Sequence, residues 1–325
     1  MKQIKDLKIK IFSDGANRQE MIEMNKKDFI QGMTTNPSLM KKAGIRDYKS
    51  FAKDILKDIQ KKPISFEVFS DDFIEMEKQG NEIASWGENV YVKIPITNTK
   101  KESSRELINK LAKKSIKLNI TAIMNIDQVK TTLSALNKST PSIISVFAGR
   151  IADTGRDPIP LMKSCVELMK ENPKSELLWA SSRELLNIFQ ADEIGCHIIT
   201  LTQGIISKFK LVNYDLAEYS LDTVKDFYKD AVEADFKWND LGSWSSIYNV
   251  STKTKDKNVV RGTGVVIDGT NNLIESKKQF TALVGVSNMA VIATSDAILV
   301  VPKDKAEQVK DVVDYLEKHN KDELL

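Results

Sequence analysis

The segment Val90-Tyr-Val-Lys-Ile-Pro-Ile-Thr97 is a short run rich in β-branched residues, placed between helical patterns at 73–85 and 104–114. Such a run predicts a strand of a parallel sheet whose outer face is covered by helices. The same alternation of strand and helix extends from residue 8 to residue 203, with strands predicted at 8–13, 29–36, 64–70, 90–97, 117–124, 142–149, 176–182 and 197–203. A strand–helix unit repeated in this way is typical of a (β/α)8 barrel, whereas the alternative, a doubly wound open sheet, usually has fewer strands. We therefore predict an α/β chain that begins with a (β/α)8 barrel.

The character of the sequence changes after Asp235. Short strands with turn residues between them, and without helical patterns, are predicted at 259–268, 273–275, 280–286, 290–294 and 298–301. A charged helix is predicted at 303–319. We predict two domains, the barrel over 1–236 and a smaller mainly-β domain over 237–325. The junction at 235–256 carries Trp238, Trp244 and Tyr248, which predict a partly ordered connection.

The composition excludes several classes of protein. The chain has 325 residues, 41% of them hydrophobic, and its 48 Lys+Arg against 45 Asp+Glu predict no broad nucleic-acid-binding surface. Its cysteines, Cys165 and Cys196, and its histidines, His197 and His319, argue against a disulfide scaffold and against a Cys-rich or multi-histidine metal centre. No run approaches about 18 apolar residues, and the first residues lack the apolar core of a secretory signal. We expect a cytoplasmic protein without membrane partners.

Polar side chains recur where the predicted strands end. Barrel enzymes carry their reactive groups at the C-terminal ends of the strands and in the loops that follow. A purely structural barrel would favour Val, Ile and Leu at these positions. The candidates for a site are Asp14, Thr34, Asn36, Glu67, Lys93, Asn119, Thr121, Ser145, Arg150, Ser181 and Arg183.

Lys93 is the most informative of these residues. With the two-residue period of a strand, Tyr91, Lys93 and Pro95 share one face, so Lys93 points into the barrel if Val92 and Ile94 meet the helices. Burying an ammonium is costly, and a neutral amine is a nucleophile that forms a Schiff base with a carbonyl group. Two interpretations remain open: a nucleophile, or a lysine that reaches solvent from a strand end or pairs with a carboxylate.

Acidic and hydroxyl side chains are predicted close to Lys93. Glu67 lies one strand away, and Asn119 and Thr121 share a face on the strand beyond. A carboxylate and a hydroxyl that flank an amine can hold a water molecule that carries protons during imine formation and hydrolysis. A structural ion pair between Glu67 and Lys93 is the alternative. Asp14 is a candidate acid/base for bond cleavage, or the N-cap of the helix that follows it.

Arg150, Ser181 and Arg183 follow the sixth and seventh predicted strands, near the place where barrels often bind phosphate. The planar guanidinium group fits phosphate oxygens. A single arginine in a loop is usually solvated, but two at neighbouring strand ends favour a phosphorylated substrate.

Three other features predict structure rather than chemistry. Gly262-Thr-Gly264 is only part of a nucleotide-loop pattern, and its place inside a predicted strand favours a bulge or turn. Cys165 falls on the apolar stripe of a helix. Cys196 lies where a strand begins, so we expect both thiols in the core.

Several motifs resemble the transaldolase family. They are Thr34-Thr-Asn-Pro-Ser38, Val90–Thr97, Leu118-Asn-Ile-Thr-Ala122, Ser145-Val-Phe-Ala-Gly-Arg150 and Trp179-Ala-Ser-Ser-Arg183. The resemblance covers residues 8–230 in the family's order. Because the barrel begins directly with its first strand, the chain is similar to the branch of small transaldolases and fructose-6-phosphate aldolases.

The resemblance implies a role for each candidate residue. Lys93 would be the Schiff-base lysine of a class I enzyme without metal or other cofactor, and Asp14 the acid/base at the cleaved bond. Glu67 and Thr121 would hold the catalytic water. The dihydroxyacetone part of the substrate would be bound by Thr34, Asn36, Asn119 and Ser145, and its phosphate by Arg150, Ser181 and Arg183.

Two positions separate the branches of this family. The aldolase branch carries a tyrosine where this chain has Phe147 and a glutamine where it has Glu67, so both positions resemble true transaldolases. After the acid/base aspartate the family usually has Thr or Ser, whereas Gly15 follows Asp14 here. This departure leaves the fine substrate specificity open.

The C-terminal part resembles another family. Trp238-Asn-Asp-Leu-Gly-Ser-Trp244 and the strands after it are similar to the end of mannose-1-phosphate guanylyltransferases. In that family the aspartate that matches Asp240 helps bind a metal, together with an N-terminal nucleotide domain that this sequence lacks. We therefore expect no guanylyltransferase activity, and predict an assembly or sugar-phosphate-recognition module.

Together these features predict a transaldolase that transfers a dihydroxyacetone unit from a ketose phosphate to an aldose phosphate, as in the pentose phosphate pathway. Its partners would be sugar phosphates, and we expect a homo-oligomer. One alternative is a specialised aldolase that makes a sugar precursor for a surface polysaccharide. The other is a non-enzymatic scaffold that binds a nucleotide sugar. A scaffold would have no physical reason to keep Asp14, Glu67, Lys93 and Thr121 together.

Overall fold

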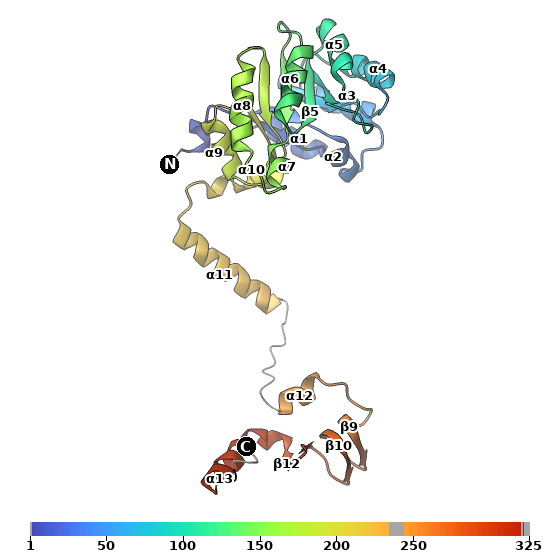
Figure 1. Cartoon of the computed structure of the whole chain (residues 1–325), viewed down its shortest axis with the longest axis vertical. Coiled ribbons are helices and arrows are strands. Elements are labelled where there is room, and N and C mark those ends of the chain that lie inside the picture. Colours follow the sequence, from blue (N-terminus) through green and yellow to red (C-terminus); the bar gives the residue numbers. More distant parts are fainter. Residues whose placement is uncertain (1, 234–243, 320, 322–325) are drawn as a thin grey trace. The chain divides into compact units, whose positions relative to one another are not determined.

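The computed structural model describes residues 2–233, 244–319 and 321. The chain divides into two compact units, Met1–Tyr219 and Ser220–Leu325 (Figure 1). The predicted domain boundary at 236/237 lies outside the described residues, as does Trp238. Among the described residues, no helix combines the length and the apolar character needed to cross a membrane.

The N-terminal unit is a closed barrel of eight parallel strands in sequential order, which confirms the predicted fold. Its strands are β1 (Lys10–Asp14), β2 (Ile30–Thr34), β3 (Ile64–Glu67), β4 (Val90–Pro95), β5 (Leu118–Ile123), β6 (Ser142–Val146), β7 (Ser175–Trp179) and β8 (Ile198–Thr202). Most end earlier than the sequence predicts. β6, for example, is predicted to reach residue 149 but ends at Val146, because the helix α7 (Ala148–Ala152) begins two residues later.

Helices surround this barrel. They are α1 (Arg18–Asn25), α2 (Pro37–Lys42), α3 (Tyr48–Asp58), α4 (Phe73–Ala84), α5 (Arg105–Lys113), α6 (Ile126–Ala135), α7, α8 (Ile159–Met169), α9 (Leu186–Glu193) and α10 (Gln203–Ile206), with 3-10 turns at Ile4–Asp6 and Ser207–Leu211. Several begin at an Asn or Asp whose side chain accepts a hydrogen bond from the backbone N–H three residues on, as Asn17 does for α1 and Asn125 for α6. The next helix, α11 (Leu216–Glu233), contains the boundary between the two units.

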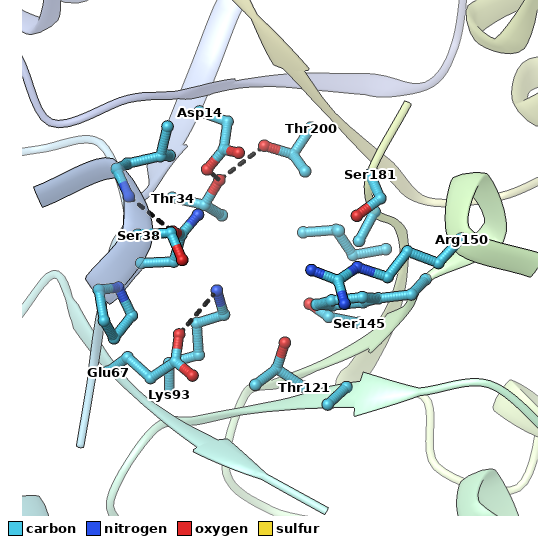
Figure 2. A pocket seen from close by; sticks show the side chains of 17 residues that line it. Asp14, Thr34, Ser38, Glu67, Lys93, Thr121, Ser145, Arg150, Ser181 and Thr200 are labelled. Atoms are coloured by element: carbon cyan, nitrogen blue, oxygen red, sulfur yellow. Dashed lines mark hydrogen bonds and ion pairs between the residues drawn. The ribbon is translucent and has the colours of Figure 1, made fainter. Parts of the chain in front are cut away.

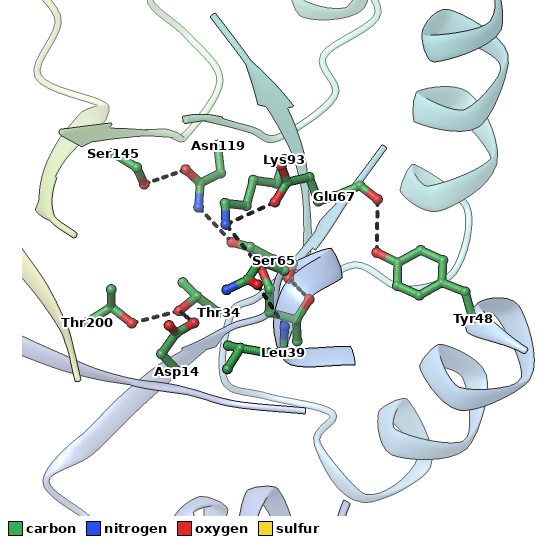
Figure 3. Close-up of polar contacts among 12 residues, drawn as sticks. Asp14, Thr34, Leu39, Tyr48, Ser65, Glu67, Lys93, Asn119, Ser145 and Thr200 are labelled. Atoms are coloured by element: carbon green, nitrogen blue, oxygen red, sulfur yellow. Dashed lines mark hydrogen bonds and ion pairs between the residues drawn. The ribbon is translucent and has the colours of Figure 1, made fainter. Parts of the chain in front are cut away.

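The two faces of each barrel strand pack differently. On β4, Val92 and Ile94 belong to the large core between strands and helices. Tyr91 instead packs with Phe12 and Leu178 in a small apolar cluster inside the barrel. The predicted alternation is therefore confirmed, and Lys93 faces the interior, as the close-ups of the site show (Figures 2 and 3).

The C-terminal unit is a four-stranded sheet in the order β12-β11-β10-β9, with α12 (Trp244–Val250) and α13 (Val309–Lys318). Its strands are β9 (Val259–Ile267), β10 (Leu273–Val284), β11 (Met289–Ala293) and β12 (Ile298–Pro302). β9, β10 and β11 are parallel although no helix connects them, an arrangement seen in β-helices, and only β12 is antiparallel. The smaller mainly-β domain is therefore confirmed as a fold.

Two details of this unit differ from the prediction. The strands predicted at 273–275 and 280–286 form the single strand β10, because a bulge after Ser276 absorbs the residues between them. The helix predicted at 303–319 begins as a 3-10 helix, Lys303–Gln308, and becomes α13 only afterwards. Trp244 and Tyr248 lie on α12 and pack onto the core of the sheet.

Candidate active site

A cavity of about 480 Å³ opens at the C-terminal ends of the barrel strands (Figure 2). Most of the residues that the sequence singles out line it: Asp14, Thr34, Asn36, Glu67, Lys93, Thr121, Ser145, Phe147, Arg150 and Ser181. They come from β1 to β7 and from the loops beyond. The barrel thus gathers at one mouth side chains that are far apart in the sequence.

Lys93 lies inside this cavity and pairs with a carboxylate. It is 6% exposed, and its Nζ lies 3.2 Å from Oε2 of Glu67 and donates a hydrogen bond to the backbone oxygen of Thr35 at 3.1 Å (Figure 3). The parallel register of β3 and β4 places Glu67 directly opposite Lys93. The predicted ion pair is therefore present, and it faces the cavity. This geometry gives the amine a proton acceptor within direct reach.

Asp14 lies across the cavity mouth at the end of β1. Its Oδ1 accepts a hydrogen bond from Thr34 Oγ1 at 2.7 Å, and Thr34 Oγ1 is 2.6 Å from the hydroxyl of Thr200 (Figure 3). Burial raises the pKa of Asp14 above its usual range, although the charge of Lys93 and the bond from Thr34 oppose the shift. Asp14 does not cap α1, because Asn17 does. A carboxyl whose pKa is raised by burial is a stronger base, once ionised, than an exposed one.

Thr121 offers an unmatched hydroxyl to the same cavity. Its side chain is 1% exposed, and its Oγ1 has no hydrogen-bond partner among the described residues. Leaving a buried hydroxyl unpaired costs about 1–3 kcal/mol. The next residue, Ala122, has a φ of 61°, a conformation that non-glycine residues rarely adopt. The cavity lining thus includes an unpaired buried hydroxyl beside a residue of rare backbone conformation.

A row of hydrogen bonds crosses the interior beside Lys93 (Figure 3). Ser145 Oγ donates to Oδ1 of Asn119 at 2.7 Å, and Nδ2 of Asn119 donates to Ser65 Oγ at 2.9 Å. Asn119 is 0% exposed and is not among the residues that line the cavity, so its contact with substrate stays a prediction. It orients Ser145, which does line the cavity.

Of the three residues expected to bind phosphate, two line the cavity and one does not. Arg150 and Ser181 line the cavity, and the guanidinium of Arg150 lies over the ring of Phe147 at 5.4 Å from its centre. Arg183 does not line the cavity. Its Nε donates to Oδ1 of Asp153 at 2.9 Å, and its Nη2 donates to the other carboxylate oxygen. This exposed bidentate pair joins Arg183 to the C-cap of α7, and a role of Arg183 in phosphate binding stays a prediction.

The family model for transaldolase and fructose-6-phosphate aldolase matches residues 11–242, most of the chain. The chain belongs to this family. A "Probable transaldolase" of Dehalococcoides mccartyi is 35% identical over 199 residues, which are 61% of this chain and 88% of the relative. A "Probable transaldolase" of Nitrosopumilus maritimus is 32% identical over 231 residues, 69% of this chain and 97% of the relative. Membership indicates an enzyme of the transaldolase or aldolase type.

A second model, for the β-helix domain of mannose-phosphate isomerase and GMP-like proteins, matches residues 262–316 of this transaldolase-family chain. The solved structure of mannose-1-phosphate geranyltransferase from Thermus thermophilus is 35% identical over 25% of this chain and 24% of its own, with a TM-score of 0.23. The predicted combination of a transaldolase-like barrel with a C-terminal segment resembling the end of mannose-1-phosphate guanylyltransferases is confirmed at the level of these two family models.

Sequence reasoning missed some cavity residues of this transaldolase-family barrel, among them Ser38, Ala122 and Thr200. Thr200 could have been found from the two-residue period, because Ile198 on the same strand faces the barrel interior. Among residues 2–233, 244–319 and 321, no three His, Cys, Asp or Glu side chains gather where they could hold a metal ion. Asp240, the residue that resembles a metal ligand, lies outside those ranges.

Proposed function

We propose that this chain is a class I transaldolase, in which Lys93 forms a Schiff base with a ketose phosphate and passes a dihydroxyacetone unit to an aldose phosphate. One observation carries the proposal. The amine of Lys93 is buried in a cavity of the barrel mouth, 3.2 Å from the Glu67 carboxylate, and Asp14 and Thr121 line the same cavity. The family to which the chain belongs supports a sugar phosphate as the substrate class.

The first half of the reaction forms the imine. The neutral amine of Lys93 adds to the ketone carbon at C2, and the nitrogen proton passes to Glu67. The former ketone oxygen receives two protons through Glu67: the one that the Lys93 ammonium gives up to become a neutral amine, and the one that leaves the nitrogen after addition. The oxygen then departs as water, and a protonated C=N bond replaces the C–O bond. The unmatched Thr121 hydroxyl is placed to hold that water. The same two side chains return the water in the hydrolysis that ends the cycle.

The second half breaks and remakes a carbon–carbon bond. The Asp14 carboxylate accepts the proton of the C4 hydroxyl, the C3–C4 bond breaks, and its electrons move onto the iminium to give an enamine on Lys93. The aldose phosphate leaves. The enamine carbon then adds to the aldehyde of an acceptor, and Asp14 returns its proton to the new alkoxide. The raised pKa of Asp14 matches this exchange, because it makes the carboxylate a stronger base.

We assign the substrate phosphate to Arg150 and Ser181, since both line the cavity. Arg183 takes part only if the phosphate replaces Asp153 as its partner. Thr34, Asn36 and Ser145 face the dihydroxyacetone part, and Asn119 acts through Ser145.

Borohydride trapping tests this function directly. Incubation with fructose 6-phosphate and borohydride should leave a reduced dihydroxyacetone adduct on Lys93, found by intact and peptide mass spectrometry. If folded protein gives no adduct with fructose 6-phosphate or with a panel of other ketose phosphates, the proposal is wrong.

Phe147 is expected to keep transfer ahead of simple cleavage. Its ring lines the cavity, and a tyrosine there would add a hydroxyl that can hold water near the imine. Phe147→Tyr should therefore raise the ratio of aldol cleavage to transfer by about tenfold. Phe147→Leu, which adds no hydroxyl, is the matched control. An unchanged ratio in the tyrosine variant would refute this role.

Gly149 allows α7 to lie close to the backbone of Ser181. A Cβ atom at Gly149 would lie 1.6 Å from the backbone oxygen of Ser181, so Gly149→Ala must push Ser181 out of place. We expect KM for fructose 6-phosphate to rise about tenfold or more, with dihydroxyacetone as donor little affected. Gly204→Ala is the control, since a Cβ there meets only ordinary contacts. Equal KM values for Gly149→Ala and the unsubstituted protein would contradict this assignment.

The match of residues 262–316 to a β-helix domain of mannose-phosphate enzymes favours a second candidate, an aldolase that makes a specialised sugar. Product analysis with a series of aldehyde acceptors distinguishes the two. A clear preference for erythrose 4-phosphate or glyceraldehyde 3-phosphate supports transaldolase, and preference for an unrelated aldehyde supports the second candidate. The homo-oligomer stays a prediction, which light scattering can check.

A further inference from the structure

The C-terminal unit has a cavity of its own, which we call the tail cavity. It has a volume of about 440 Å³ and is lined by Trp244, Ile247, Arg261, Glu275, Lys277, Lys278, Ile292, Ala293, Thr294 and Ser295. Its floor is a rung of the sheet, because Glu275 of β10 pairs in register with Arg261 of β9 and with Ile292 of β11. The volume lies in the range of small-molecule sites, about 300–1,000 Å³.

The charged lining of the tail cavity is cationic. Arg261, Lys277 and Lys278 contribute three positive charges and Glu275 one negative charge, which leaves a formal surplus of two. The Nε of Arg261 lies 3.1 Å from Oε2 of Glu275, whose side chain is 14% exposed. Glu275 thus contacts the guanidinium at one nitrogen, and the Arg261 side chain is 50% exposed. A cavity lined by one guanidinium and two lysines suits a doubly charged phosphate ester.

The two lysines lie on a loop whose backbone is fixed by hydrogen bonds. They belong to the bulge in which β10 leaves β9 between Ser276 and Thr281. The hydroxyls of Ser276 and Thr263 both donate to the backbone oxygen of Gln279, at 2.6 and 3.0 Å, and so fix the tip of the bulge. Both lysines are exposed, and an anion bound in the cavity would reduce the repulsion between their charges.

Gly262 makes this loop possible. Its φ is +97°, and a Cβ there would lie 1.9 Å from the backbone oxygen of Ser276. The Gly262-Thr-Gly264 motif therefore marks a bulge, as the sequence predicts, and that bulge shapes the cationic rim of the tail cavity.

The remaining lining suits a ring. The lining includes the aromatic Trp244 and the aliphatic Ile247 and Ile292, and Ser295 adds a hydroxyl. Aromatic side chains provide stacking surfaces for nucleic-acid bases, and their faces attract cations as well. An apolar wall beside a cationic rim fits a ligand with both a ring and a phosphate.

We propose that the tail cavity binds a phosphate ester of a ring-bearing compound, a sugar phosphate or a nucleotide, with the phosphate at Arg261, Lys277 and Lys278 and the ring against Trp244. This site is independent of Lys93. The chain would then have two phosphate-recognising sites, a catalytic one in the barrel and a binding one in the C-terminal unit.

Titration calorimetry on the full chain tests the proposal, with mannose 1-phosphate, GDP, inorganic phosphate and mannose as probes. At least one of the two esters should bind, more tightly than phosphate or mannose, and the better ester identifies sugar phosphate or nucleotide as the source. The double variant Lys277→Ala/Lys278→Ala should lose about tenfold or more in affinity for that ester.

Three controls separate the tail cavity from the barrel. Lys310→Ala/Lys318→Ala removes the same charge from α13, at positions that do not line the cavity, and should leave affinity unchanged. Arg150→Ala should also leave it unchanged, and the Lys277→Ala/Lys278→Ala protein should still give the borohydride adduct on Lys93 if the proposed function is right. The tail-cavity proposal is overturned if neither ester binds at millimolar concentration, or if the Lys277→Ala/Lys278→Ala protein binds as tightly as the unsubstituted chain.

Discussion

Lys93→Met is expected to eliminate the borohydride-trapped adduct and to lower kcat/KM for transaldol transfer by about 10⁴-fold or more. No other group replaces the amine that carries the substrate through cleavage and transfer, so the loss should not be rescued by higher substrate concentrations. The measurement is a coupled assay with fructose 6-phosphate and erythrose 4-phosphate, together with mass spectrometry of the trapped protein. Retained turnover in this variant would refute the Schiff-base assignment.

The control for Lys93→Met must separate chemistry from folding. Removing the ammonium leaves Glu67, whose side chain is 17% exposed, without its ion-pair partner, and breaking a buried pair in this way costs about 3–5 kcal/mol. Lys93→Arg keeps a cation beside Glu67 but provides a group that does not deprotonate. We therefore expect Lys93→Arg to be folded by circular dichroism and inactive. Activity in the arginine variant would be as damaging to the assignment as activity in the methionine variant.

Asp14→Asn should lower kcat by about 10²–10⁴-fold, because the amide keeps the shape of the carboxyl but cannot accept the proton of the cleaved alcohol. The imine should still form, since Asp14 acts after it. The variant should therefore retain a trappable adduct, which now has the mass of the uncleaved ketose phosphate, while losing transfer. Loss of adduct and transfer together would place Asp14 in the first half of the reaction and contradict its proposed role.

The same substitution should stabilise the fold at neutral pH. Burial raises the pKa of Asp14 in the folded state above its ordinary value of 3.8, so folding binds a proton and the native form loses stability as pH rises through the raised pKa. The amide of the Asp14→Asn variant does not titrate. The difference in free energy of unfolding should thus be smallest below about pH 4, increase with pH in favour of the variant, and level off above the raised pKa. Denaturant unfolding of both proteins at several pH values measures this difference in free energy. The raised pKa would be contradicted if the advantage of the variant over the unsubstituted chain were smaller at pH 8 than at pH 4.

Most of what the sequence could predict came from the two-residue alternation of side chains along each strand. Alternation on β4 placed Val92 and Ile94 against the helices and Lys93 inside, and the order of the strands put Glu67 next to it. These features follow from local geometry, because a parallel strand has two faces and consecutive strands of a barrel are neighbours. The cavity at the strand ends follows from the same two facts.

The features that sequence reasoning did not predict depend on distant contacts. The pairing of Arg183 with Asp153 joins two loops that follow different strands, and nothing in either loop alone indicates it. The bulge of β10 looks like a break between two strands, because the polar run through Lys277 and Lys278 resembles a turn. Only the register with β9 shows that the strand continues.

The hydrogen-bonded row of Ser65, Asn119 and Ser145 constrains how this barrel can be re-engineered. Each of the three side chains is hydrogen-bonded to its neighbour in the row. A substitution at one position therefore leaves a buried polar atom at the next position without a hydrogen-bond partner, at a cost of about 1–3 kcal/mol. Effects at the three positions should therefore be strongly epistatic. A directed-evolution library that varies them one at a time will reject variants that a library varying all three together would accept, and access to new donor sugars will depend on that choice.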